Sequence, residues 1–186
     1  MAIKFGIPGD VGSFSEEAAL LYTKQDSVAI SFMYLLDMDG VLSAIEKQEI
    51  DLGILPVVNL QGGLVQPALQ AMGKHLFTPI DEIWLHVYQS LLVIPGTLAH
   101  QITNIVSHAQ SFAQCKDYLR KEFQDIALIE WCNTAKAARD LAAGTLAACN
   151  AVIASERCAE LYGLEIMAQN IQDSTNNLTA FIVVKK

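Results

Sequence analysis

Polar side chains stand at the mouth of an apolar segment near the end of this sequence. Asn176, Asn177 and Thr179 precede the apolar residues 182–184, a run that is typical of a buried strand. Amides and hydroxyls at such a place need hydrogen-bond partners, because an unsatisfied polar group costs free energy when it is buried. Two amides and one hydroxyl in this position therefore predict a site that binds a polar ligand.

A second group of polar side chains follows a predicted strand at residues 102–106. Ser107 comes directly after this β-branched run, and Gln114 lies about one and a half turns into the helix predicted next. Open α/β sheets bind ligands at the carboxyl ends of their strands, and a helix that starts there offers free N–H groups to an anion. The same side chains also fit a helix cap that binds no ligand. The pattern leaves both interpretations open.

Three more polar side chains lie at predicted strand ends or helix starts. Asn59 and Asn133 each follow a predicted strand, and Ser13 begins a helix in capping-box form. Each of them is common at a helix start or a turn when it is taken alone. Together with Asn177 and Thr179 they predict one ligand site to which several strand ends contribute.

Strands and helices alternate along most of the sequence. This alternation predicts an α/β fold with mostly parallel sheets. The pattern is interrupted at Thr78-Pro79, with strand–helix alternation on both sides of the break. We therefore expect two similar α/β lobes, the first from residues 1–78 and 170–186 and the second from residues 83–165. Small-molecule sites are common between lobes, so the expected active site is a cleft between these two.

The charge of the chain argues against some classes of partner. A net charge of −8 over 186 residues, with no run of Lys and Arg, argues against nucleic acid and against an anionic membrane surface. No apolar stretch reaches the length of a membrane span, and Pro8 and Gly9 interrupt the start before a signal-peptide core could form. A cytoplasmic location is therefore expected.

The four cysteines do not have the spacing of a metal site. Cys115, Cys132, Cys149 and Cys158 include no CxxC pair and have no His at metal-ligand spacing. Without a secretory signal, free thiols in a reducing compartment are favoured over disulfides. Neither a metal ion nor a disulfide is expected.

Several of these residues lie in segments that resemble, in order along the chain, the catalytic domain of the prephenate dehydratase family. The matching segments include Gly12-Ser13-Phe14-Ser15, Leu55-Pro56-Val57-Val58-Asn59, Ser107-His108-Ala109-Gln110, Gln114-Cys115, Asn133-Thr134-Ala135 and Asn177-Leu178-Thr179-Ala180-Phe181. They cover essentially the whole chain, and in combination they are highly specific. The resemblance implies a two-lobed α/β fold of the type II periplasmic-binding-protein kind, with the substrate between the lobes.

The resemblance also implies an activity. The family reaction turns prephenate into phenylpyruvate with loss of carbon dioxide and water, a lyase step of phenylalanine biosynthesis that needs no cofactor. By resemblance, Thr179 is the catalytic residue, as the donor or relay of the proton that the departing hydroxyl takes up. The residues implied in substrate binding are Ser13, Asn59, Ser107, Gln114, Asn133, Asn177 and Phe181. Many members carry a regulatory domain that senses phenylalanine, and none is expected in residues 1–186; a homodimer is a further expectation.

The sequence departs from the family pattern at four positions. Ala180 stands where the family has the arginine of Thr-Arg-Phe, and Val58 stands where it usually has a glutamate. Leu60 and Asn133 replace a small hydroxyl residue and a serine. Because prephenate is a dianion and a guanidinium is a natural partner for a carboxylate, another cation is expected to compensate. The candidates are Lys74, His75, His108 and Lys136.

Two other functions fit the altered motif. One is a prephenate decarboxylase that leaves the ring non-aromatic, as in some family members of secondary metabolism. The other is a protein that binds a ligand without catalysis. The retained Thr179 favours dehydration over the first alternative. The product formed from prephenate distinguishes all three.

Overall fold

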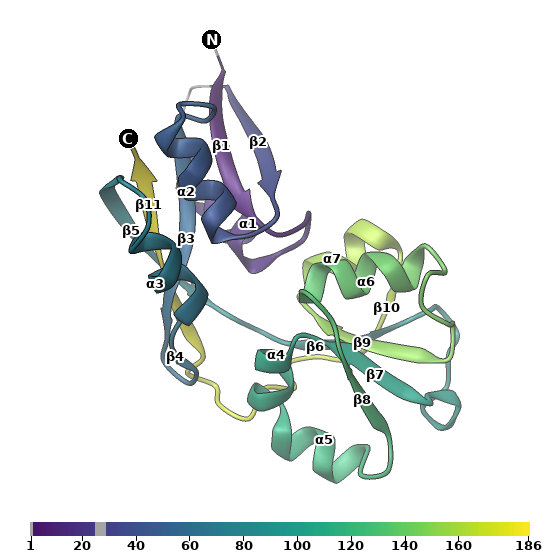
Figure 1. The fold of residues 1–186 in the computed structure, drawn as a ribbon. Helices are drawn as coiled ribbons and strands as arrows, with labels where there is room; N and C mark the ends of the chain where they lie inside the picture. The colour runs from purple at the N-terminus through teal and green to yellow at the C-terminus, as the bar shows by residue number, and fades with distance from the viewer. Residues whose placement is uncertain (1, 25–28) are drawn as a thin grey trace. The chain divides into compact units, whose positions relative to one another are not determined.

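The computed structural model describes residues 2–24 and 29–186, which form two compact units (Figure 1). The first unit runs to His86 and includes Leu178–Lys186, and the second unit is Val87–Asn177. The predicted start of the second strand at Val28 lies outside the described residues.

The first unit is a mixed sheet with helices on both faces. Its strand order is β2-β1-β3-β11-β5, and the short β4 pairs with β3. The strands are β1 (Ile3–Pro8), β2 (Ile30–Leu35), β3 (Leu52–Asn59), β4 (Gly63–Leu64), β5 (Thr78–His86) and β11 (Leu178–Lys185). The helices are α1 (Phe14–Thr23), α2 (Met38–Glu46) and α3 (Gln66–Met72).

Strand β11 shows how the two faces of this sheet are built. Phe181 and Val183 join the hydrophobic cluster that contains residues of α1. Ile182 joins the cluster that contains residues of α2 and α3, and Val184 does the same. Because successive side chains of a strand point to opposite faces, α1 covers one face and α2 and α3 cover the other.

The second unit has the same construction with a different strand order. Its sheet runs β10-β6-β9-β7-β8. The strands are β6 (Ser90–Val93), β7 (Asn104–Ser107), β8 (Ala127–Glu130), β9 (Asn150–Ala154) and β10 (Glu165–Ala168). The helices are α4 (Ala109–Gln114), α5 (Lys116–Glu122), α6 (Thr134–Ala142) and α7 (Glu156–Tyr162), with the 3-10 turn η1 (Ala99–Gln101) before β7. Helices α6 and α7 share one hydrophobic cluster, and α4 and α5 share the other.

Both sheets are mixed, which corrects the prediction of mostly parallel sheets. The strands β2, β1 and β3 are parallel, as are β8, β7 and β9, but β11 is antiparallel to β3 and β5, and β6 is antiparallel to β9 and β10. Strand–helix alternation predicts only the parallel pairs. The short β4 is antiparallel to β3, and the other antiparallel strands are those that flank, in the sequence, the two places where the chain passes between the units, which alternation does not reveal.

Two local predictions also differ from the structure. Thr78-Pro79, where the sequence predicts a break, begins the edge strand β5, a place that tolerates proline. The predicted helix 109–123 is two helices that meet at Cys115, whose φ of −116° and ψ of 21° are not helical. Asp173 causes this break, because its N–H donates to the carbonyl of Gln114 and its carboxylate accepts from the N–H of Asp117.

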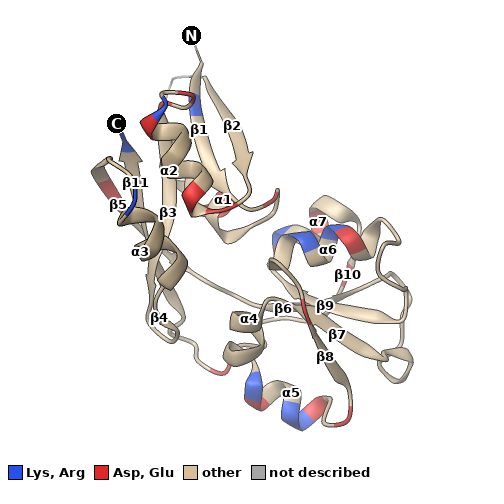
Figure 2. Cartoon of the chain, viewed as in Figure 1, with Lys and Arg blue, Asp and Glu red and all other residues tan. Residues whose placement is uncertain are grey.

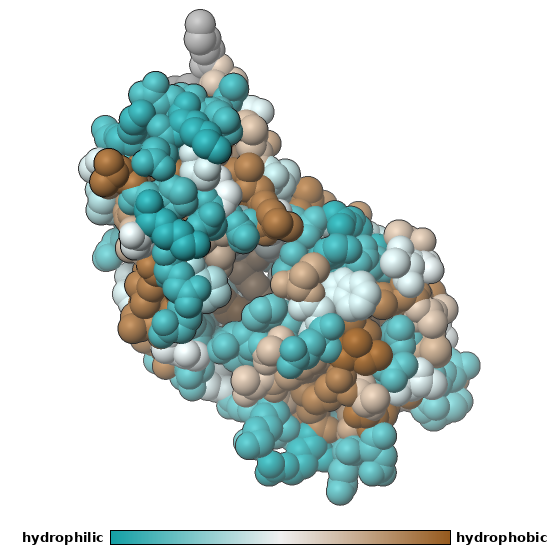
Figure 3. Space-filling view, viewed as in Figure 1, coloured by the Kyte–Doolittle hydropathy of each residue, from teal (hydrophilic) through white to brown (hydrophobic). Residues whose placement is uncertain are grey.

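The edge strand β8 brings apolar side chains to the surface of the second unit. Leu128 and Ile129 are 46% and 38% exposed. Figure 3 shows a hydrophobic patch on this unit in the region of β8 and α5. None of the helices in residues 2–24 and 29–186 combines the length and the apolar character needed to span a bilayer.

Candidate functional site

Asn59 and Thr179 form a buried hydrogen-bonded pair in the first unit. They are register partners at the ends of β3 and β11, and each is 7% exposed. The Asn59 Nδ2 donates to Thr179 Oγ1 at 2.9 Å, and its Oδ1 accepts from the N–H groups of Gln61 and Gly62 at 3.0 and 2.7 Å. The two backbone donors fix which end of the amide faces Thr179. The turn after β3 therefore orients a donor toward the threonine hydroxyl.

This arrangement suits the Thr179 hydroxyl for proton donation. Its oxygen accepts a hydrogen bond from Asn59, and so its own proton is the part of the group that can be given to a ligand. A donor at the oxygen also stabilises the negative charge that develops as the proton leaves. Burial keeps competing water away from the pair.

Phe181 lies two residues after Thr179 but belongs to the core. It is 2% exposed and packs in the cluster that contains Phe5, Ile7 and Ala18. Its side chain holds β11 against α1, which differs from the predicted substrate contact. The register shift between Ala180 and Phe181 lies on β3, where Val57 has no register partner on β11, so the alternation along β11 continues and places Phe181 on the same core face as Val183.

Ala180 and Val58 are side by side in the sheet. They are register partners on β11 and β3, and Trp84 of β5 is the partner of Ala180 on its other side. Ala180 is 5% exposed. Because Ala180 follows Thr179 in a strand, its side chain points to the opposite sheet face. Two of the departures from the family pattern therefore form one apolar pair behind the Asn59–Thr179 pair.

Ser13 has a local structural role in the first unit. Its side chain caps α1 by accepting from the N–H of Glu16 at 3.3 Å. The Glu16 carboxylate in turn accepts from the N–H of Gly12 and from the hydroxyl of Tyr34, both at 2.6 Å. Gly12 has a φ of +86°, a conformation that favours glycine. The predicted capping box thus rigidifies the loop after β1.

A row of buried amides crosses the second unit. The Gln89 Nε2 donates to Gln114 Oε1 at 3.0 Å, and the Gln114 Nε2 donates to Asn177 Oδ1 at 3.4 Å. The Asn177 Nδ2 then donates to the carbonyl of Val87 at 3.0 Å. A backbone carbonyl can only accept, so it sets the direction of every amide in the row. Gln114 and Asn177 were predicted as site residues, and the structure brings them together.

Gln89 is the member of this row that sequence reasoning missed. It is 2% exposed, and its backbone bonds to the side chain of Gln172 and the N–H of Ile171. Nothing in the local sequence distinguishes it, because its partners lie far along the chain. It stands two residues before the apolar residues 91–94, with Ser90 between.

Ser107 and Asn133 are tied to the same end of the second sheet. The Ser107 hydroxyl donates to the carbonyl of Ile153 at 2.7 Å, and its own carbonyl accepts from the N–H of Trp131 at 2.8 Å. Asn133 caps α6, with its Oδ1 accepting from the N–H of Lys136 at 2.6 Å. Both residues lie where predicted, at the carboxyl ends of β7 and β8, and the structure gives each a structural hydrogen bond.

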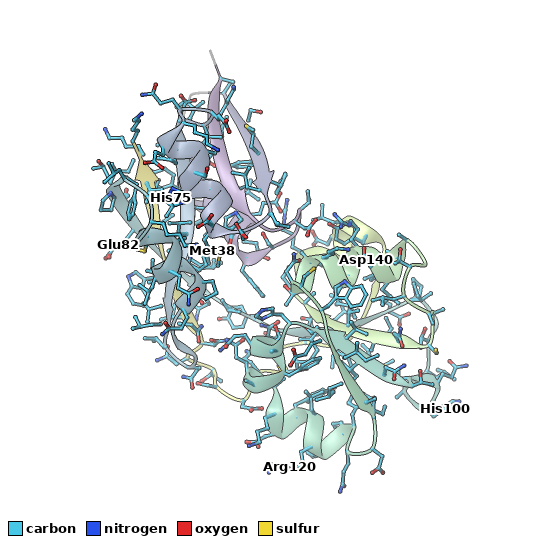
Figure 4. All side chains as sticks on the ribbon, in the orientation of Figure 1. Met38, His75, Glu82, His100, Arg120 and Asp140 are labelled. Atoms are coloured by element: carbon cyan, nitrogen blue, oxygen red, sulfur yellow. The ribbon has the colours of Figure 1, made fainter. Side chains whose placement is uncertain are left out.

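A charged cluster lies on the first turns of α6. Lys136 Nζ is 2.5 Å from Asp140 Oδ2, and the indole N–H of Trp131 donates to the same oxygen at 2.9 Å. Burial raises the pKa of Asp140, but the hydrogen bonds from Lys136 and Trp131 outweigh it, so the pKa lies below its usual value. The carboxylate is therefore charged at neutral pH. Figure 4 labels Asp140 within this part of the second unit.

The other three candidate cations have partners elsewhere. Lys74 pairs with Asp39 at 3.0 Å and His75 contacts Glu46 at 2.9 Å, on the α2–α3 side of the first unit (Figure 4). The hydrogen bond from Lys74 lowers the pKa of Asp39. His108 caps α4, with its Nδ1 accepting from the backbone N–H of Gln110 at 3.2 Å.

The chain itself joins the polar groups of the two units. Asn177 ends the amide row of the second unit, and Thr179 belongs to the pair of the first unit. Their Cα atoms are two residues apart and therefore at most about 7 Å from each other. Among the described residues, no three His, Cys, Asp or Glu side chains gather as metal ligands do. The available chemistry is that of neutral hydrogen-bond donors and of lysine.

The comparisons with known proteins all point to the same family. A family model described as prephenate dehydratase matches residues 5–186. Arogenate dehydratase 5 of Arabidopsis thaliana is 33% identical over 182 residues, which are 97% of this chain and 41% of that protein. The bifunctional chorismate mutase/prephenate dehydratase of Neisseria gonorrhoeae is 31% identical over 179 residues, which are 95% of this chain and 48% of that protein. The chain thus spans less than half the length of these curated relatives.

A solved structure agrees in fold. The prephenate dehydratase of Arthrobacter aurescens, determined in complex with L-Phe, has a TM-score of 0.85 at 23% identity. The match covers 99% of this chain and 60% of that one. The predicted α/β fold is confirmed by this likeness.

Proposed function

The chain belongs to the prephenate dehydratase family, and from this premise we propose that it converts prephenate into phenylpyruvate. The observation that supports the proposal most directly is the buried hydrogen bond from Asn59 to Thr179. It presents a hydroxyl proton at the point where the family motif has its threonine. The row of amides that ends at Asn177, two residues away, offers further polar contacts for one small substrate.

The proposed reaction needs one proton and no other reagent. The bond between the ring and its carboxylate breaks, and its electron pair enters the ring as carbon dioxide leaves. The ring C–O bond breaks at the same time, and the hydroxyl takes up a proton and leaves as water. Aromatisation supplies the driving force. Prephenate dianion plus one proton thus gives phenylpyruvate, carbon dioxide and water.

Thr179 is assigned the delivery of that proton. A threonine hydroxyl is a very weak acid, so the transfer must be concerted with C–O cleavage or pass through the hydroxyl from a water molecule. The donor from Asn59 stabilises the oxygen while its proton is shared. Asn59, Gln114 and Asn177 are proposed to orient the substrate through neutral hydrogen bonds, which leave the ring carboxylate free to depart.

The missing arginine does not contradict this proposal. Position 180 faces away from Thr179, and its cross-strand neighbour Val58 is apolar as well. A buried arginine beside Val58 would lack a carboxylate, so the two apolar residues are mutually consistent. The Asn59–Thr179 hydrogen bond is present with both departures in place.

Arogenate is a second candidate substrate. The curated relatives include proteins named arogenate dehydratase, with 32% and 33% identity in Petunia hybrida and Arabidopsis thaliana. Arogenate carries an ammonium group where prephenate has a keto oxygen, and its ring chemistry is the same. The cytoplasmic location and the homodimer stay predictions.

One assay tests the proposal. The purified protein is incubated with prephenate and, separately, with arogenate, and the products are identified by mass spectrometry and ultraviolet absorbance. Phenylpyruvate from prephenate supports the proposal, and phenylalanine from arogenate assigns the second substrate. A non-aromatic keto acid from prephenate would point to a decarboxylase, and recovery of both substrates unchanged would point to a binding protein.

A further inference from the structure

Strand β5 is an edge of the sheet in the first unit (Figure 1). It stands last in the strand order β2-β1-β3-β11-β5, and within the part of the chain that the structure describes, β11 is the one strand that pairs with it. With nine residues, Thr78–His86, it is longer than the usual strand. The outer N–H and C=O groups of a long edge strand form a template on which another strand can pair.

The backbone groups at this edge belong to every second residue of β5. The N–H of Val87, the residue after β5, donates at 2.7 Å to the carbonyl of the residue before β11. Alternate residues of an antiparallel strand bond to the same neighbour, so the backbone groups of Glu82, Trp84 and His86 point away from β11. The N–H of Glu82 agrees with this direction, because it donates at 2.8 Å to the carboxylate of the adjacent Asp81 rather than to β11.

Trp84 stands at the end of an apolar row that crosses this sheet. Its register partner on β11 is Ala180, followed by Val58 on β3 and Leu64 on β4. Register partners point to the same sheet face, so the four side chains are neighbours. Trp84 and Leu64, at the two ends, are 46% and 58% exposed. The two departures from the family pattern make the middle of the row apolar, and the row reaches the sheet edge as a half-exposed indole.

The edge is complementary to itself in one antiparallel register. When two copies of β5 pair about Trp84, Glu82 lies opposite the partner's His86. Ile83 then lies opposite the partner's Leu85, which gives an apolar pair on the other sheet face. β5 has two carboxylates and neither Lys nor Arg (Figure 2), and the ring N–H of His86 is the donor that this register brings to Glu82. A pairing about Glu82 instead would oppose two carboxylates.

We propose that β5 is the interface of a homodimer, in which a second copy of the chain pairs antiparallel with it about Trp84. A two-fold axis through this pair gives the commonest symmetry of protein dimers. The outward backbone groups of Trp84 and Glu82 bond to those of the partner's Trp84 and the partner's His86. The N–H of Glu82 thereby exchanges the carboxylate of Asp81 for a carbonyl of the partner. The two indoles meet at the axis, where each covers the exposed end of the other's apolar row.

Charge exchange between Glu82 and His86 tests this register. Sedimentation velocity at micromolar concentration should give the mass of a dimer for the unchanged protein. Glu82→Lys removes the acceptor and His86→Glu opposes two carboxylates, at two places in each dimer, so each should raise the dissociation constant about 10–100-fold. The double variant Glu82→Lys/His86→Glu restores an opposite-charge pair and should return the constant to within about fivefold of the original. Glu49→Lys makes the same charge change at an exposed position outside β5 and, as the matched control, should leave the constant unchanged.

Oxidative cross-linking measures the register directly. The exposed Cys132 and Cys149 are first replaced by serine, which leaves two buried thiols. Opposed Cα atoms of a hydrogen-bonded antiparallel pair are about 5.5 Å apart, a separation that suits a disulfide. Trp84→Cys in this background should therefore form a covalent dimer. Asp81→Cys is the matched control and should stay monomeric on a non-reducing gel, because its counterpart lies about 20 Å away along the strands in this register.

Several outcomes would overturn the pairing through β5. They are a chain that sediments as a monomer at micromolar concentration, a dimer that neither Glu82→Lys nor His86→Glu weakens, and a cross-link through Asp81→Cys in place of Trp84→Cys. Native near-ultraviolet circular dichroism of each variant shows that a loss of the dimer is not a loss of the fold. Every readout is a mass, so the test holds whether or not the chain converts prephenate.

Discussion

The polar side chains of the two units are organised in different ways. In the first unit, Asn59 and Thr179 form a buried pair of neutral side chains joined by a hydrogen bond. In the second unit, three amides form a row and Lys136 and Asp140 form a charged cluster. The first unit therefore presents a hydroxyl proton, and the second unit presents a row of neutral amides and an ion-paired lysine.

The proposed reaction has two requirements that conflict when one group of side chains must meet both: loss of the ring carboxylate and binding of a dianion. Decarboxylation is favoured where the ring carboxylate is poorly neutralised, whereas binding of a dianion is favoured near a cation. A neutral amide beside Thr179 assists the proton donor without adding charge.

The largest expected effect comes from the hydroxyl of the first unit. Thr179→Val keeps the shape of the side chain and removes the proton donor. We expect kcat with prephenate to fall about 10²–10⁴-fold, the usual worth of general acid catalysis, with little change in KM. Stopped-flow and steady-state absorbance of phenylpyruvate measure this change.

Two control variants test whether the loss of the Thr179 hydroxyl itself causes the fall in kcat. Thr179→Ser retains a hydroxyl and should recover most of the rate. Thr103→Val removes a hydroxyl from an exposed position of the second unit and should have no effect. A Thr179→Val protein with undiminished turnover would mean that the hydroxyl only holds Asn59, and the division between the units would not stand.

The second prediction concerns the apolar pair behind Thr179. Ala180→Arg and Val58→Glu each place one charge in a half-buried to buried setting without a partner. Each should lower the free energy of unfolding by about 1–3 kcal/mol, through overpacking or an unpaired charge. The double variant forms a cross-strand ion pair and should recover part of that loss. Urea denaturation followed by circular dichroism measures the coupling.

The same variants test how much the missing arginine matters. Because position 180 faces away from Thr179, we expect Ala180→Arg to leave the KM for prephenate within about threefold. A marked drop in KM would show that an arginine at this position reaches the substrate. The first unit would then be able to supply its own cation, and the comparison between the units would have to be redrawn.

The parts of this molecule that were predictable are those set by local pattern. The strand at residues 178–184 was expected from its apolar run, and its end places Thr179 in the polar pair. Asn133 was expected as a helix cap, and it is one. In both cases the period of the strand or the helix start determines which way a few neighbouring side chains point.

The unpredicted parts depend on residues far apart in the chain. The register that pairs Asn59 with Thr179, and Val58 with Ala180, is set by packing across the sheet and leaves no local trace. Gln89 was missed for the same reason, since its partner Gln114 lies on another element. Phe181 was predicted to bind substrate because it belongs to a motif, whereas the sheet places it in the core.

A third prediction uses pH to examine the charged cluster of the second unit. The pKa of Asp140 is lowered in the folded protein, so its ion pair stabilises the fold above the unfolded pKa near 4. This contribution is lost as the pH falls through the lower folded value. Asp140→Asn should therefore reduce Tm by about 3–8 °C at pH 7. The difference in Tm between this variant and the unchanged protein should become smaller below about pH 4. Calorimetry from pH 2 to 8 measures it.

The comparison variant is Asp39→Asn in the first unit. Asp39 also has a lowered pKa, because Lys74 hydrogen-bonds to it, but its carboxylate is exposed to solvent. Exposed ion pairs contribute little to stability, so this variant should have a smaller effect on Tm than Asp140→Asn at every pH. Equal reductions in Tm would show that the Lys136–Asp140 ion pair stabilises the fold no more than an exposed ion pair does.

The smallest effect is expected from thiol chemistry, which reports on the second unit alone. All four cysteines of the chain lie between Val87 and Asn177. Burial raises the pKa of the Cys115 thiol to about 12, with a further contribution from the carboxylate of Asp173. At pH 8 this thiol is therefore protonated, and the thiolate is the reactive form. Iodoacetamide should label the exposed Cys132 and Cys149 of the native protein and leave Cys115 and Cys158 unmodified.

This labelling pattern isolates the second unit from changes made in the first. Cys115 directly follows Gln114, the last residue of α4. The protection of Cys115 from iodoacetamide therefore reports whether the end of α4 that positions Gln114 is folded. Thr179→Val should leave the protection of Cys115 unchanged in peptide mass maps, because the hydroxyl is bonded to Asn59 of the first unit. Gln89→Ala removes the donor to Gln114 and should speed Cys115 labelling severalfold through local opening. Faster labelling in Thr179→Val would show that the pair and the row are coupled through Leu178, the residue between Asn177 and Thr179, and that the two units do not work as separate parts.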